Sequence, residues 1–126
     1  MASELRVNTL KDAAGNNSVG MSTVAGGSAK AWVNFQGSGT AVVRDGLNSS
    51  SLTDNGSGDY TNTFTSALAN TDFATPTSSK QSDVYNDRYL SIKAASTTTT
   101  RSYHYNYSIN YHDADYAHIA VFGDLA

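Results

Sequence analysis

Large and small side chains alternate along RSYHYNYSINY, residues 101–111. From Tyr103 to Tyr111 every second residue is tyrosine or isoleucine, and the residues between are serine, asparagine or histidine. A period of two predicts a β-strand, because successive side chains of a strand point to opposite faces. The aromatic face, with Tyr103, Tyr105, Tyr107 and Tyr111, fits a sheet interior, a subunit contact or a sugar-binding platform. We expect burial, in the subunit or against a neighbour, because monomers rarely expose so large an apolar patch.

A second apolar pattern begins at KAWVNF, residues 30–35. Ala31, Val33 and Phe35 share one face of the predicted strand, while Trp32 and Asn34 share the other. Since both faces carry large apolar groups, this strand is expected to be covered on both sides. Trp32 and Phe35 are therefore predicted to pack in the core or in an assembly contact.

Further alternating stretches extend the pattern. Asp54-Asn55-Gly56 predicts a hairpin turn because Asn and Gly tolerate positive φ, and residues 60–64, 84–94 and 116–122 predict strands. Residues 13–17 predict a turn, and residues 65–83, with the single proline Pro76, predict a long surface loop. We count about seven strands, spaced roughly 8–12 residues apart, and no helix. This pattern is typical of an all-β fold, an antiparallel β-sandwich or small barrel.

The first 29 residues form a separate region with few large side chains, among them Leu5 and Val7. Their apolar area is too small for an independent core. A disordered leader would explain this, but we favour an extended N-terminal arm, residues 1–29, that becomes ordered in an assembly. The β-sandwich domain is then expected over residues 30–126.

Composition and charge narrow the range of partners. The net charge is −3 and the eight Lys and Arg residues are scattered, which argues against nucleic-acid binding. There is no cysteine, hence no disulfide and no thiolate ligand. No apolar run approaches membrane-spanning length, so membrane insertion is not expected.

Candidate chemistry is sparse. His104, His112, Asp113 and His118 are weak candidates for a metal site, because their spacing matches no established ligand pattern and HDAD lacks the glycine and glutamate of a calcium loop. Turn-favouring aspartates and strand-face histidines explain the same residues. The sequence lacks a Gly-x-Ser-x-Gly elbow and has one glutamate, so we expect no catalytic residue, no enzyme activity and no cofactor.

Loops at the ends of the predicted strands are the places where a receptor contact is expected. STTTTR and HDADY supply Thr98, Thr99, Asp113 and Asp115. Loops on a rigid β scaffold can vary without disturbing the core.

One family resemblance rests on two stretches. KAWVNFQGSGTAVVRDGLNSSSLTDNGSGDYTNTFTSALANTDF, residues 30–73, resembles a segment of fibre and tail-associated virion proteins of tailed bacteriophages, especially those of marine and cyanobacterial hosts. The leader SELRVNTLKDAAGNNSV is similar to the lead-in of those proteins, and the likeness covers residues 1–75. At Gly46 and Leu47 the chain departs from the Ser-Phe of the family pattern, so that corner is expected to pack differently.

This resemblance implies a non-enzymatic structural role in the virion. It implies a homotrimer of β-rich subunits, forming a short fibre, appendage or adaptor on the tail or head. The N-terminal arm would then contact other virion proteins, and a host surface glycan is a further expected partner. The alternative is a carbohydrate-binding β-sandwich module that uses the aromatic strand from Tyr103 to Tyr111.

Overall fold

The computed structural model describes residues 3–81 and 88–126 of the chain. Within these residues there are ten strands and one short helix. The N-terminal elements are β1 (Thr9–Lys11), β2 (Ser18–Gly20) and α1 (Met21–Gly27). The remaining strands are β3 (Ala31–Gln36), β4 (Val42–Leu47), β5 (Ser49–Gly56), β6 (Asp59–Phe64), β7 (Thr77–Lys80), β8 (Arg88–Ala95), β9 (Thr99–Asn106) and β10 (Tyr116–Val121).

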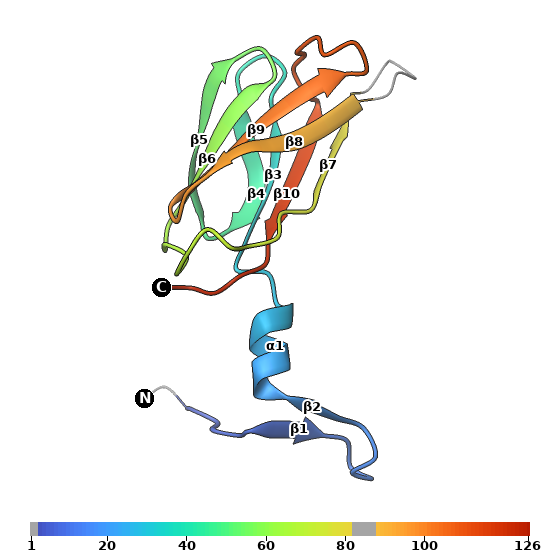
Figure 1. Cartoon of the computed structure of the whole chain (residues 1–126), viewed down its shortest axis with the longest axis vertical. Coiled ribbons are helices and arrows are strands. Elements are labelled where there is room, and N and C mark those ends of the chain that lie inside the picture. Colours follow the sequence, from blue (N-terminus) through green and yellow to red (C-terminus); the bar gives the residue numbers. More distant parts are fainter. Residues whose placement is uncertain (1–2, 82–87) are drawn as a thin grey trace.

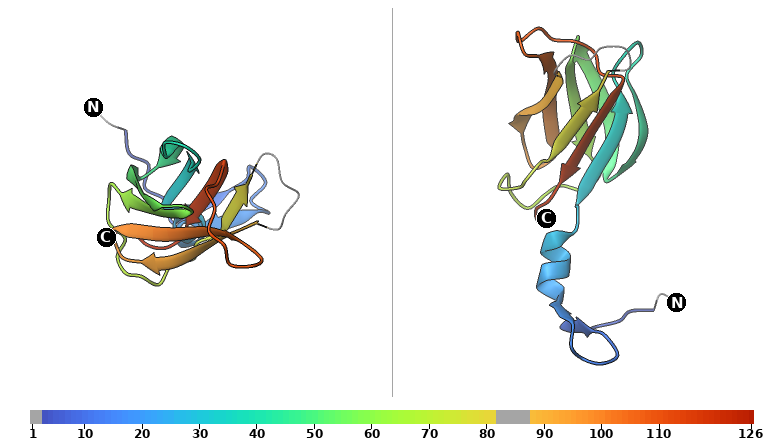
Figure 2. Two further views of the ribbon diagram at one scale, coloured as in Figure 1. Left: turned by 90° about the horizontal axis from the view of Figure 1, so that it is seen from above. Right: turned by 90° about the vertical axis from the view of Figure 1, so that its right-hand side faces the viewer.

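Two antiparallel sheets of four strands pack face to face (Figure 1). Their orders are β4-β3-β10-β7 and β5-β6-β9-β8, and a separate pair, β1-β2, lies outside them. Figure 2 shows the two layers from above and from the side. The prediction of an all-β antiparallel sandwich is therefore confirmed, and the two distinct sheets distinguish it from a closed barrel.

Three of the strands at the sheet edges are irregular. The register shifts within the β3–β4 pair between Asn34 and Phe35, within β5 on both sides of its centre, and within β8 between Ile92 and Ala94. Such bulges bend an edge and interrupt its row of free backbone groups. The fourth edge strand, β7, has only four residues.

The core lies between the inner faces of the two sheets. Its largest members are Phe35 of β3, Tyr60 and Phe64 of β6, and Leu68 from the chain after β6, each at most 5% exposed. The Phe35 and Tyr60 rings meet edge to face with centroids 5.1 Å apart, which joins one sheet to the other.

The inner face of β9 is the polar face of the strand, opposite to the sequence prediction. Thr100, Ser102 and His104 are buried, and the tyrosines that alternate with them point outward. The physical reason is volume. Phe35, Tyr60 and Phe64 already fill the interior, so the strand packed against them contributes small side chains.

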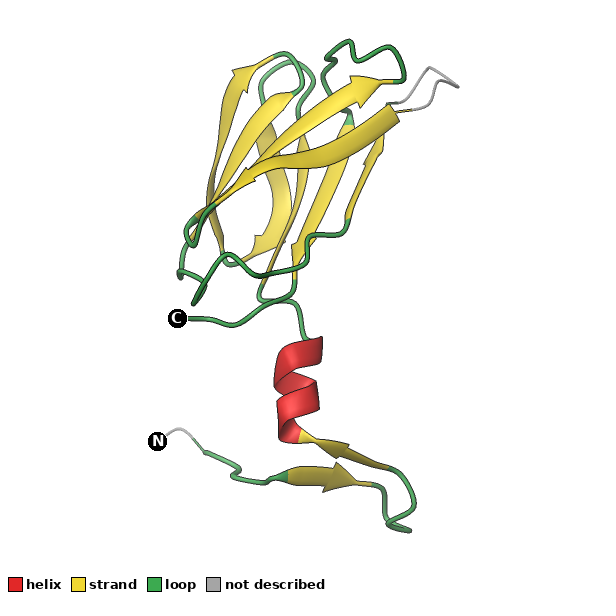
Figure 3. Ribbon diagram, viewed as in Figure 1, coloured by secondary structure: helices red, strands yellow, loops and turns green. Residues whose placement is uncertain are grey.

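The outer face of β3 is also more open than predicted. Ala31, Val33 and Phe35 are buried as expected, but Trp32 keeps 36% of its surface exposed. No second layer covers this side of the sheet (Figure 3) among the described residues. Trp32 is thus not a core residue of the subunit.

The predicted long loop over residues 65–83 is wrong for most of the part that the structure describes. Leu68 is 2% exposed and belongs to the core, and Thr77–Lys80 forms β7 against β10. Sequence alternation missed β7 because its residues, TSSK, contain no apolar side chain. Residues 82 and 83 of this loop, and residues 84–87 of the strand predicted over 84–94, lie outside the described residues.

Residues 3–28, here called the N-terminal segment, lie at one end of the sandwich, near the C-terminus (Figure 1). β1 and β2 pair around the predicted turn, where the Asp12 carboxylate accepts hydrogen bonds from the Asn16 amide and the Asn17 side chain. No residue of the N-terminal segment is buried. Leu5 is 80% exposed and Val7 36%, so neither belongs to the core of the subunit.

Helix α1 corrects the prediction that the chain has no helix. Its sequence, MSTVAGG, lacks an apolar stripe at helical spacing and contains weak helix formers, which explains why the pattern gave no signal. No side chain caps its N-terminus. No helix in the described part of the chain is long and apolar enough to cross a membrane.

Candidate binding surface

Four tyrosines gather on the outer face of the β5-β6-β9-β8 sheet and form the tyrosine surface: Tyr89, Tyr103, Tyr105 and Tyr111. Tyr89 of β8 is the register partner of Tyr105 on β9, and their ring centroids are 5.8 Å apart. Tyr111 returns from the following loop to bridge Tyr105 and meets the Tyr103 ring edge to face at 5.0 Å. Strand pairing thus brings together rings that are up to 22 residues apart, from Tyr89 to Tyr111.

This surface is open in the subunit, so the prediction that the tyrosines are buried within it is wrong. Tyr111 and Tyr89 are each 47% exposed, and Tyr107, beyond the end of β9, is 73% exposed. Tyr103 and Tyr105 are half-buried by their neighbours on the same face. Burial of the surface against a neighbouring subunit stays a prediction.

Charged groups hold the tyrosines in place. The Arg101 guanidinium donates two hydrogen bonds to the Asp59 carboxylate, at 2.8 and 2.5 Å, and this pairing holds the pKa of Asp59 below its usual value. Lys93 lies over the Tyr103 ring, 4.3 Å from its centroid, and donates a hydrogen bond to the hydroxyl of that tyrosine. The cluster is therefore fixed by contacts inside the subunit.

A small hollow of about 190 Å³ lies at the edge of this surface. Tyr103 and Tyr111 form its aromatic wall, and Asn55, Ser57 and Asp59 provide polar groups. Aromatic faces beside amide, hydroxyl and carboxylate groups are suited to a hydroxylated ligand of the size of one sugar ring.

The hollow is anchored to the core by a hydrogen-bonded node below it. The Asp113 carboxylate accepts hydrogen bonds from the Gly58 amide at 2.9 Å and from the buried Tyr60 hydroxyl at 3.0 Å. Burial raises the pKa of Tyr60. Gly58 has a φ of 64°, and a Cβ there would collide with the carbonyl oxygens of His104 and His112, so glycine is required.

A receptor contact at Asp113 and Asp115 stays a prediction, and the structure adds a role for both residues in the fold. Asp113 supports the hairpin turn, and Asp115 accepts a hydrogen bond of 2.8 Å from the Ser38 hydroxyl. Thr98 is exposed in the turn before β9, whereas Thr99 is half-buried and is the first residue of that strand. A receptor contact at these threonines stays a prediction.

The weak metal candidates do not come together as a ligand set in the described part of the chain. His104 is fully buried, and its Nδ1 donates to the His112 carbonyl at 2.7 Å. Burial lowers the pKa of His104, which keeps the ring neutral. His118 lies on the outer face of the other sheet, on β10. Among the described residues, no three His, Cys, Asp or Glu side chains lie close enough to hold a metal ion.

Sequence reasoning missed the polar part of this surface. Asp59, Lys93 and Arg101 were not singled out, although Asp59 follows the predicted hairpin turn and Arg101 alternates with Tyr103. Cross-strand neighbours such as Asp59 and Tyr103 depend on strand order, which alternation within one strand does not contain.

Comparison with protein-family models, with curated proteins and with solved structures gave no match.

Proposed function

We propose that this chain is a non-enzymatic structural protein of a phage virion, a short appendage or adaptor on the tail or head. In this proposal the N-terminal segment makes the assembly contacts and the sandwich is displayed. The observation that carries it is the exposure of apolar side chains outside the core: Leu5, Val7, Leu10, Val19 and Val24 are each at least 36% exposed.

Energetics support an assembly role for the N-terminal segment. A pair of three-residue strands and a seven-residue helix with two glycines are too short to be stable by themselves. The segment also buries no residue of its own in the sandwich. Contact with other copies of the chain, or with other virion proteins, would cover these side chains and supply the missing stabilisation.

The virion setting and the homotrimer come from the sequence resemblance described above. A closed symmetric assembly is the common way for identical subunits to cover apolar surface. With three copies, the three N-terminal segments would cover one another and attach the sandwiches to a larger particle.

The experiment compares the whole chain with a chain lacking residues 1–24. Light scattering and circular dichroism are measured on both at the same concentration. The whole chain is expected to be a trimer of 13.3 kDa subunits, and the shortened chain a folded monomer. A whole chain that is a compact monomer at micromolar concentration would contradict the proposal.

A second candidate function is carbohydrate binding at the tyrosine surface. It is favoured by the exposure of Tyr111 and Tyr89 and by the hollow beside Asp59. The two candidates differ in what Tyr111→Ala does. Loss of saccharide binding with an unchanged oligomeric state supports the platform, and loss of the trimer supports a subunit contact.

A further inference from the structure

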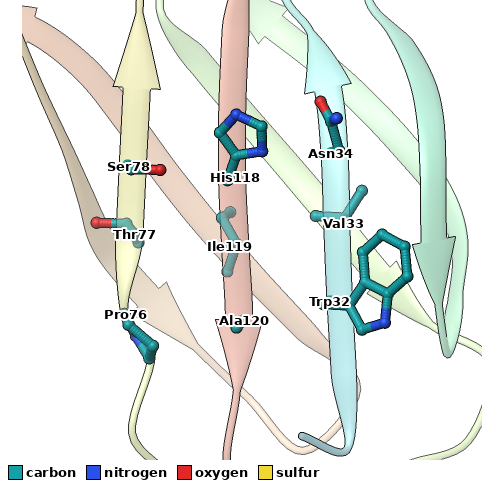
Figure 4. A pocket seen from close by; sticks show the side chains of 9 residues that line it. All are labelled: Trp32, Val33, Asn34, Pro76, Thr77, Ser78, His118, Ile119 and Ala120. Carbon is teal, nitrogen blue, oxygen red and sulfur yellow. The ribbon is translucent and has the colours of Figure 1, made fainter.

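A second hollow lies on the opposite side of the molecule, on the outer face of the β4-β3-β10-β7 sheet (Figure 4). It has a volume of about 470 Å³ and runs along β10 between β3 and β7. Ala120 forms a low floor on β10, with Trp32 on β3 and Pro76 before β7 at the two sides. We call it the Trp32 groove.

The small floor and the tall sides give the groove its shape. Trp32 is the register partner of Ala120, and the Ala120 amide donates a hydrogen bond to the Pro76 carbonyl. Neighbouring strands are about 4.8 Å apart, so the two sides are separated by about 10 Å. Figure 4 shows the Trp32 indole on the side of β3 away from Ala120, and 36% of the residue is exposed.

Polar side chains form a row across the groove, one step along the strands from Trp32. His118 on β10 is the register partner of both Asn34 on β3 and Ser78 on β7. His118 and Ser78 are exposed. The Asn34 Oδ1 atom is shielded from solvent and accepts no hydrogen bond from any described residue. Leaving the Asn34 Oδ1 atom without a hydrogen bond costs free energy. A ligand that displaces the neighbouring His118 ring would supply the missing donor from one of its hydroxyl groups.

Two cations lie one step further along the same face. Lys80 is the register partner of Tyr116, and the Arg44 guanidinium lies 3.9 Å from the centroid of the Tyr116 ring. Neither cation has a carboxylate within ion-pair distance in the part of the chain that the structure describes. The Arg44 guanidinium also donates a hydrogen bond to the Gln36 Oε1 atom at 2.8 Å, and the Lys80 Nζ atom lies 5.9 Å from the centroid of the same Tyr116 ring.

The two carboxylates nearby, Asp45 and Asp115, accept hydrogen bonds from other groups. Asp45 pairs with Asn34 from the β4 side, away from β10, and its carboxylate accepts a hydrogen bond from the Gly46 amide. Asp115, next to Tyr116, is held by the Ser38 hydroxyl.

We propose that the Trp32 groove binds an acidic saccharide, with one sugar ring stacked on Trp32 and a carboxylate of a further ring near Lys80 and Arg44. Ala120 and Tyr116 are four residues apart on β10, which corresponds to about 13 Å. The row at His118 lies between them and meets the ring hydroxyls. Two cations are too few for a nucleic-acid backbone, whose binding needs many more contacts.

The test uses the intrinsic fluorescence of Trp32, the single tryptophan of the chain. The whole protein is titrated with trigalacturonic acid, triguluronic acid and 3′-sialyllactose. A saturable change in Trp32 emission is expected with at least one of the three, with a dissociation constant below about 1 mM. The neutral methyl ester of trigalacturonic acid serves as the matched control for that ligand.

Variants distinguish this site from other occupants. Lys80→Gln and Arg44→Gln are each expected to weaken binding about tenfold, the loss typical of one charge-assisted hydrogen bond. Tyr107 lies beyond the end of β9 and does not line the groove, so Tyr107→Ala leaves the affinity unchanged. Circular dichroism confirms that each variant is folded.

Three results would overturn the proposal. The first is the absence of binding for all three acidic trisaccharides. The second is a dissociation constant that is unchanged in both Lys80→Gln and Arg44→Gln. The third is a change of oligomeric state in Trp32→Ala, which would make the groove a subunit contact. None of these results depends on whether the N-terminal segment assembles the protein.

Discussion

At the scale of single residues, Asp113 joins the hairpin turn, the core and the loop that carries Tyr111. Its carboxylate is the partner of the Tyr60 hydroxyl, whose ring is fully buried. Removing a partner from a buried polar group costs more than the bond itself contributes, because the group that remains cannot return to water.

We therefore expect Asp113→Ala to lower the free energy of unfolding by about 1–3 kcal/mol. Urea denaturation at neutral pH measures the change, and Asp72→Ala is the matched control because Asp72 is exposed. Equal midpoints for the two variants would show that Asp113 is a loop residue without a structural role.

His104 predicts a dependence of stability on pH. Burial lowers the pKa of its imidazole in the folded chain below the usual 6.5; the hydrogen bond to the His112 carbonyl opposes this shift, and the charge of Arg88 adds to it. Below pH 6.5 the unfolded chain therefore binds more protons than the folded chain. The free energy of unfolding is expected to fall as pH drops below 6.5, by at most about 1.4 kcal/mol per unit from this group.

Thermal unfolding between pH 7.5 and 5 measures this slope. His104→Asn can still donate a side-chain hydrogen bond but does not titrate, so it should flatten the slope. His118→Asn, on the outer face of β10, should leave it in place. The assignment to His104 fails if the two variants behave alike.

At the scale of elements, the two faces of β3 have different energetic roles. Phe35 is fully buried against Tyr60, whereas Trp32 keeps more than a third of its surface in water. Phe35→Ala is expected to cost about 3–5 kcal/mol, and Trp32→Ala clearly less, since part of the indole stays solvated. Chemical denaturation of the two variants measures the difference, and equal losses would mean that another copy covers Trp32.

The strands show how far the sequence could predict this molecule. Alternation identified β3, β6, β9 and β10 because each contains aromatic or β-branched residues two positions apart. The prediction of which β9 face lies inside the subunit was wrong, because alternation defines two faces but does not say which of them is buried. That choice depends on the volume already filled by Phe35 and Tyr60, which come from other strands.

The same limit applies to the candidate sites. The Tyr103–Tyr111 pattern identified an aromatic face, since those residues are close in sequence, but not that this face is open in the subunit. Trp32, His118 and Lys80 are spread over 87 residues and meet only through the pairing of β3, β10 and β7. No local pattern contains that strand order.

At the scale of the whole molecule, the sandwich and the N-terminal segment differ in local stability. The segment has no buried residue, and backbone that buries little opens most easily. In dilute solution trypsin is therefore expected to cut after Lys11 well before it cuts after Arg101, which lies within β9. Mass spectrometry of timed digests identifies the first cut.

Raising the protein concentration provides the control for this digestion. If copies assemble through the N-terminal segment, cleavage after Lys11 should slow as the concentration rises, while the sandwich shows no such effect. Early cleavage within β9 at any concentration would mean that the sandwich is the less stable part.

The irregular edges of the two sheets have a consequence for the behaviour of the protein at high concentration. A long, regular edge strand offers free backbone groups on which another chain can grow, and this is a common route to aggregation. Here β4, β5 and β8 are bulged and β7 is short, so no edge of the two sheets, as far as the described residues define them, presents a straight template. Many copies can be concentrated side by side without merging their sheets. Sandwiches that pack together would then meet through their side chains.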